Sequence, residues 1–117
     1  MTYEQKELLL TLGVNFDVTL ERFMGNEALF IKCLKKLLAD NNYSKLLNAI
    51  ENSDVKTAFE CSHALKGVTA NLGLDDLTDE FKTIVEVFRA ERMDYDPANL
   101  ERLKEKYKKA IEVIEQL

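Results

Sequence analysis

The stretch SHALKGVTANLGL, residues 62–74, contains the only histidine of the 117-residue chain and two of its four glycines. Its apolar residues recur at helical spacing, and the pattern begins after Ser53 or Asp54, either of which can cap a helix that runs to Gly73. Because a helix advances about 100° per residue, residues three or four apart in this stretch lie on the same side of the helix. The set that we expect to face the core is Val55, Ala58, Ser62, Leu65, Thr69 and Leu72.

Helical spacing also dominates the rest of the chain, which has one proline and no tryptophan. The apolar pattern predicts further helices over about residues 2–12, 17–25, 26–40, 46–54, 74–92 and 97–117. Asp17, Asn26 and Asp96 are the expected N-caps, and Pro97 suits a first helical position because its missing N–H costs nothing there. We therefore predict an all-α fold, an antiparallel four-helix bundle with short additional N-terminal helices, formed by residues 1–117 as one domain.

Composition and charge narrow the classes of partner. The chain has 16 Lys and Arg against 21 Asp and Glu, a formal net charge of -5, so binding to nucleic acid or to an anionic membrane lacks electrostatic support. No apolar run approaches the roughly 20 residues that a membrane span needs. Cys33 and Cys61 lack Cys-x-x-Cys spacing and fall at helical apolar positions, where reduced thiols pack as small hydrophobes. We expect a soluble, cytoplasmic protein.

The single histidine lies away from the predicted core side of its helix. The residues that share the side of His63, at spacings of three or four, are Lys56, Phe59, Glu60, Lys66, Gly67 and Ala70. Glycine in a helix interior costs roughly 0.8–1 kcal/mol relative to alanine, and the core does not require Gly67, so we expect it to keep the surface beside the imidazole bare. A nucleophilic ring nitrogen, the charge of Lys66 and a cleared surface suit transfer of an anionic group between two proteins.

The segment HALKGVTANLG resembles the histidine phosphotransfer (HPt) domain pattern, His-x-Leu-Lys-Gly followed by five residues and a glycine. The residues that meet the pattern here are His63, Leu65, Lys66, Gly67 and Gly73. The stretch FMGNEALFIKCLKKLLAD, residues 23–40, is also similar to the helix that precedes the phosphorylated one in that family. The helix order fits the family across most of the chain, and the first dozen residues are less diagnostic.

The resemblance implies that His63 accepts a phosphoryl group from the aspartyl phosphate of one receiver domain and passes it to the aspartate of another. Lys66 would stabilise the charge on the phosphohistidine. The docking surface for the receiver would comprise Phe59, Glu60, Gly67 and Ala70. The expected partners are response-regulator receiver domains and a hybrid sensor histidine kinase. The carrier would need no cofactor, because the magnesium and the catalytic aspartates belong to the receiver. It would have no kinase activity, since the chain contains no Gly-x-x-x-x-Gly-Lys-Ser/Thr loop for a nucleotide. A monomer would suffice for the transfer.

Two other functions fit parts of the same stretch. The sequence ECSH, residues 60–63, matches the Glu-x-x-His half of a di-iron site, and Cys61 with His63 would suit zinc, but one histidine cannot complete either site. The other alternative is a non-catalytic adaptor bundle whose histidine no longer accepts phosphate. Loss of His63, Lys66 or Gly67 would favour the adaptor, and all three are present. Phosphorylation by a phosphorylated receiver distinguishes the two functions. The roles of two residues stay open. Phe59 can lie at the rim of the core or contact a docked partner, and Glu60 can orient the imidazole ring or be solvated.

Overall fold

All regular structure in the computed structural model, which covers residues 1–117, is helical, as the sequence predicts. The helices in chain order are α1 (Tyr3–Leu10), α2 (Phe16–Arg22), α3 (Glu27–Lys36), the 3₁₀ turn η1 (Leu37–Ala39), α4 (Asn42–Glu51), α5 (Val55–Asn71), α6 (Asp75–Arg89) and α7 (Pro97–Glu115). Asn26 and Asp96 cap α3 and α7, and Pro97 occupies the first turn of α7, so these three predictions are confirmed.

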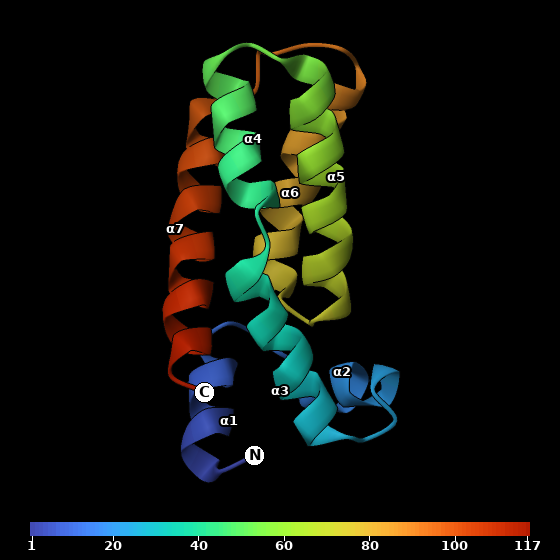
Figure 1. Cartoon of the computed structure of the whole chain (residues 1–117), viewed down its shortest axis with the longest axis vertical. Coiled ribbons are helices and arrows are strands. Elements are labelled where there is room, and N and C mark those ends of the chain that lie inside the picture. Colours follow the sequence, from blue (N-terminus) through green and yellow to red (C-terminus); the bar gives the residue numbers. More distant parts are fainter.

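Helices α4, α5, α6 and α7 form an antiparallel four-helix bundle, which confirms the predicted architecture (Figure 1). Each of these helices packs beside the next one along the chain. α3 leads into α4 through η1, while the short helices α1 and α2 lie at the end of the bundle where α5 and α7 terminate. The Nε2 atom of Gln5 in α1 donates a hydrogen bond to the main-chain oxygen of Leu117, 3.1 Å away, and so joins the two ends of the chain.

The core consists of one apolar stripe from each helix. α6 shows the stripe most clearly, since Leu77, Phe81, Ile84 and Phe88 follow one another at spacings of three and four and are at most 3% exposed. Other fully buried side chains are Leu9, Phe30, Leu34, Leu46, Leu65, Leu74, Leu103 and Ile114. Burying one such side chain contributes about 1.5–3 kcal/mol, so these stripes supply most of the favourable free energy of folding.

The start of α2 differs from the prediction. The helix begins at Phe16 rather than after Asp17, because the Asn15 side chain caps it by accepting a hydrogen bond from the Val18 N–H at 3.3 Å. Asp17 lies in the first turn instead, where its negative charge suits the positive end of the helix dipole. The N-cap is therefore Asn15, a residue that the sequence pattern did not single out.

The connection between α3 and α4 also differs from the prediction. The α-helix stops at Lys36 rather than at about Asp40, and η1 continues it for one turn. α4 then begins at Asn42, within the DNNYS stretch that the sequence assigns to a loop, rather than at Leu46. Asp40 Oδ1 accepts a hydrogen bond from the Asn42 N–H at 2.8 Å, and this bond supports the early start. The polar residues of the first turn of α4 carry no apolar signal that would reveal the helix.

The end of α5 is fixed by contacts with α2. Gly73 follows α5 with a φ of +76°, and a Cβ atom at this position would collide with Thr19 Oγ1. Arg22 Nη1 donates hydrogen bonds to the carbonyl oxygens of Ala70, at 2.9 Å, and Asn71, at 3.3 Å. These carbonyls belong to the last turn of the helix, which is short of backbone donors. The predicted stop at Gly73 is therefore both a left-handed turn and a close contact between helices.

A buried carboxylate joins α6 to α7. Glu80 is 7% exposed and accepts hydrogen bonds from Lys106 Nζ at 2.6 Å, Asn99 Nδ2 at 3.0 Å and Arg102 Nε at 3.2 Å. Burial alone raises the pKa of Glu80, but the hydrogen bonds from Lys106, Asn99 and Arg102 and the charge of Lys106 outweigh burial, so the pKa lies below its ordinary value of 4.5. The ionised carboxylate therefore stabilises the packing of α7 on α6.

We predict that Glu80 makes the fold sensitive to acid. Because the folded-state pKa is lowered, its carboxylate stabilises the fold above about pH 4.5, and this contribution is lost as the pH falls through the folded-state pKa. Glu80→Gln mimics the protonated side chain and should lower the free energy of unfolding by about 1–3 kcal/mol at neutral pH, and by much less in acid. Urea unfolding of both proteins measures the difference, and an equal difference at both pH values contradicts the prediction.

The two glycines in the region of α5 should respond to alanine in opposite directions. A Cβ atom at Gly67, inside α5, would meet no atom within 4 Å, so Gly67→Ala should raise the free energy of unfolding by about 0.8–1 kcal/mol. Gly73→Ala should lower it by about 1–2 kcal/mol or more, because it strains a left-handed backbone and collides with Thr19. Urea unfolding checks both signs, and two changes of the same sign contradict this account.

Candidate functional site

Helix α5 has one buried side and one exposed side. Ala58, Ser62, Leu65 and Thr69 are each 0% exposed, as predicted for the core side. Ser62 Oγ donates a hydrogen bond to the carbonyl oxygen of Ala58 at 2.6 Å, so its hydroxyl is satisfied within the helix. His63, the next residue, is exposed. The packing of α5 therefore turns the only imidazole of the chain outward.

Two buried hydroxyls fix α6 against the core side of α5. Thr69 Oγ1 donates a hydrogen bond to the carbonyl oxygen of Leu65 at 2.8 Å and accepts one from Thr78 Oγ1 of α6, also at 2.8 Å. Both threonines are at most 3% exposed. Because a buried hydroxyl without a partner is costly, this pair sets the register of the two helices next to the site.

The other residues predicted for the site lie along the same side of α5 but differ in exposure. Glu60 and Gly67 are exposed, whereas Lys66 and Ala70 are half-buried. None of the ion pairs of the chain includes Lys66 or Glu60. The charge of Lys66 is therefore free to interact with an anion that approaches His63.

Gly67 has no structural requirement within the chain. It lies in regular α-helix, and the position of a Cβ atom there is open space. Gly73 differs in both respects, since its φ is positive and its Cβ position is occupied by Thr19. Alanine would fit at residue 67 and would favour the helix. The packing of the chain therefore gives no reason for a glycine at residue 67.

Phe59 connects His63 to α6, a contact that the sequence analysis missed. The ring centroids of Phe59 and His63 lie 5.5 Å apart with their planes inclined at 53°. The guanidinium carbon of Arg89 in α6 lies 5.1 Å from the centroid of the Phe59 ring, within the range of a cation–π contact. Phe59 is half-buried and packs against the core cluster, so it lies at the rim of the core. No local pattern signals Arg89, because the contact joins two separate helices.

A groove opens between α5 and α6 beside these side chains. It has a volume of about 480 Å³ and is lined by Val55, Lys56, Phe59, Phe88, Arg89 and Glu91. The groove is bounded by residues that precede His63 in α5, whereas the bare surface at Gly67 follows it. Along α5, His63 thus lies between the residues that line this groove and Gly67.

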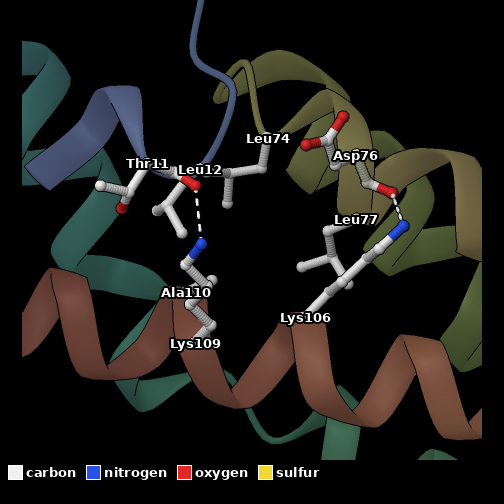
Figure 2. Close-up of a pocket in the computed structure, with 8 residues that line it drawn as sticks. All are labelled: Thr11, Leu12, Leu74, Asp76, Leu77, Lys106, Lys109 and Ala110. Carbon is white, nitrogen blue, oxygen red and sulfur yellow. Dashed lines mark hydrogen bonds between the residues drawn. The ribbon is translucent and has the colours of Figure 1, made fainter.

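A second cleft, of about 140 Å³, contains no residue of α5 (Figure 2). It lies between the segment after α1, the start of α6 and the middle of α7. Lys109 Nζ donates a hydrogen bond across it to the carbonyl oxygen of Thr11 at 2.9 Å, and Lys106 Nζ approaches that of Asp76 at 3.5 Å. Since Lys106 also pairs with Glu80, both lysines serve to pack α7 against the rest of the chain.

The remaining groups that carry chemistry do not gather into a second centre. No three His, Cys, Asp or Glu side chains lie close enough together to form a metal site. Cys61 is buried and Cys33 half-buried, and both thiols are free, as the sequence predicts. No helix has the length and apolar character needed to cross a lipid bilayer.

Comparison with known proteins identifies the family. A family model described as "Hpt domain" matches residues 37–113, from η1 through most of α7, which is more than half of the chain. Comparison with curated proteins and with solved structures gave no match. The match spans all four helices of the bundle and includes the whole His63 side of α5. The chain therefore belongs to the Hpt domain family, whose members are phosphotransfer histidine carriers in phosphorelays rather than kinases.

Proposed function

We propose that His63 accepts a phosphoryl group from the aspartyl phosphate of one receiver domain and that the protein passes it to the aspartate of another. The observation that carries the proposal is the exposed imidazole of His63 on a helix whose other side is buried. One turn after it lies Gly67, a glycine that the fold does not require. Family membership supports a carrier on histidine, and His63 is the only histidine that the chain offers.

Each transfer moves one phosphoryl group without any change of oxidation state. The unprotonated ring nitrogen of His63 attacks the phosphorus of the acyl phosphate while the P–O bond to the aspartate breaks, and the carboxylate leaves with the electron pair. The other ring nitrogen keeps its proton. In the onward step, a carboxylate oxygen of the second receiver attacks the phosphorus, the P–N bond breaks, and neutral imidazole is restored.

We assign Lys66 to stabilisation of the phosphoryl charge. It follows His63 by one helical turn, a spacing at which helical side chains are neighbours, and no internal ion pair occupies it. Lys66 is only half-buried, and solvent screens its interaction with a phosphoryl group on the exposed His63, so the expected contribution is about 1 kcal/mol. Lys66 therefore tunes the lifetime and transfer rate of the phosphohistidine, whereas the nucleophile is the imidazole alone.

We assign Phe59, Glu60, Gly67 and Ala70 to the docking surface for the receiver. Gly67 and Ala70 carry little or no side chain, so a loop of the receiver can bring its aspartyl phosphate close to the ring and in line with the attacking nitrogen. Glu60 lies one turn before His63 and borders the approach. With so little side chain at Gly67 and Ala70, this surface would recognise the receiver by the position of its backbone.

In the proposed chemistry, the receiver and the carrier contribute different groups. Magnesium and the acidic residues that bind it belong to the receiver, and the carrier supplies the nucleophile, one cation and the docking surface. A hybrid sensor histidine kinase would provide the first phosphorylated receiver, and a monomeric carrier suffices for each transfer. The two free thiols suit the reducing conditions of the cytoplasm, where we place the protein.

His63→Gln should abolish phosphoryl acceptance and leave stability within about 0.5 kcal/mol of wild type, because the side chain is exposed. Incubation with a phosphorylated receiver, followed by electrophoresis with a phosphate-binding reagent, measures acceptance, and urea unfolding measures stability. A parallel incubation with ATP, without kinase or receiver, should phosphorylate neither the wild type nor His63→Gln. Phosphorylation of the glutamine variant, or labelling from ATP alone, would refute the proposed function.

Gly67→Gln should separate docking from chemistry. The side chain would stand where the backbone of the receiver must approach, so transfer from the receiver should fall by about tenfold or more. Phosphoramidate needs no docking surface, so its slow phosphorylation of His63 should survive. The measured quantity is the ratio of the receiver-dependent rate to the phosphoramidate rate.

Gly67→Ala is the matched control for this ratio. Alanine favours the helix at least as well as glutamine but adds only a methyl group, so it should reduce the ratio far less than glutamine does. Equal ratios in wild type and Gly67→Gln would show that Gly67 does not clear a path for the receiver.

A further inference from the structure

The imidazole of His63 is held by an aromatic contact. None of the side-chain hydrogen bonds in the bundle reaches the ring, and its aromatic neighbour is Phe59, with ring centroids 5.5 Å apart. Exposed side chains change rotamer on the picosecond to nanosecond timescale unless something holds them. The orientation of the nucleophile therefore depends on where the Phe59 ring lies.

Phe59 is in turn held from two directions. One part of its ring packs against the core cluster, which makes it half-buried. The guanidinium carbon of Arg89 lies 5.1 Å from its centroid, and Arg89 Nε also pairs with Glu86 Oε1 at 3.3 Å. Arg89 is in the last turn of α6, so α6 is connected to the imidazole of His63 through the ring of Phe59.

We propose, building on the function proposed above, that Arg89 and Phe59 are positioning residues for phosphoryl transfer. Arg89 fixes the Phe59 ring, and Phe59 limits the rotamers of His63 to those that present the attacking nitrogen to the incoming phosphorus. In-line attack requires the reacting atoms to be aligned, so a restricted imidazole raises the rate without Arg89 touching the phosphoryl group. This role adds to the contact that Phe59 makes with a docked receiver.

Phosphoramidate is the appropriate probe, because it reacts with His63 without docking on the surface around it. Arg89→Gln should slow this reaction by about two- to fivefold, the factor that corresponds to a cation–π contact at a partly exposed site. Phe59→Leu should slow it at least as much, since leucine keeps the apolar packing but removes the aromatic contact. Arg92→Gln is the matched control, because Arg92 pairs with Asp94 instead, and its rate should equal that of wild type.

The double variant Phe59→Leu/Arg89→Gln tests whether Arg89 acts through Phe59. If it does, the double variant reacts no more slowly than Phe59→Leu alone. If the two factors multiply, Arg89 acts on the phosphoryl group directly, and the positioning role is refuted. Thermal unfolding of all variants confirms that the proteins compared are folded.

The imidazole ring protons give a readout that is independent of rate. The Phe59 ring current displaces their NMR signals, so Phe59→Leu and Arg89→Gln should both move them toward the positions of an unstructured histidine, and Arg92→Gln should not. Unchanged signals and an unchanged phosphoramidate rate in Arg89→Gln would overturn the proposal. Failure of the wild type to accept phosphate from either phosphoramidate or a receiver would instead overturn the proposed function.

Discussion

The burial of one side of α5 is the constraint on which the rest of the site depends. Leu65 and Ala58 are fully buried between neighbouring helices, and the hydroxyl pair of Thr69 and Thr78 fixes the rotation of α5 against α6. Because a helix is rigid, this packing also fixes the direction of His63, which must face solvent. The buried side of α5 thus holds the bundle together, and its exposed side presents His63. We therefore expect changes on the exposed side of α5 to affect transfer at little cost in stability.

The short N-terminal helices contribute by ending the helix that carries the histidine. They precede the part of the chain that matches the Hpt domain family, yet Thr19 occupies the space beside Gly73, and Arg22 donates to the carbonyls of the last turn of α5. The contact with Thr19 requires a glycine at residue 73, whereas no contact within the chain requires one at residue 67. The two glycines of one short motif therefore have different physical reasons, one in folding and one, we propose, in recognition.

The sequence was sufficient to predict the helical bundle, the core side of α5 and the exposure of His63, because all three follow from the spacing of apolar residues within single helices. It failed where the determining contact was polar or long-range. The start of α4 depends on the Asp40 side chain, and the start of α2 on Asn15, neither of which belongs to an apolar pattern. The contact of Arg89 with Phe59 joins residues of two helices, so no local spacing reveals it.

We propose, as the central claim, that the exposed imidazole on α5 accepts a phosphoryl group and gives it up again. The most direct measurement follows a labelled phosphoryl group through the purified protein, first from a phosphorylated receiver and then, after that receiver is removed, to an unphosphorylated second receiver. We expect one label per chain, located on His63, labile in acid and stable in base, and discharged by the second receiver. A label on another residue, a base-labile linkage, or a phosphoprotein that the second receiver cannot discharge would contradict the claim.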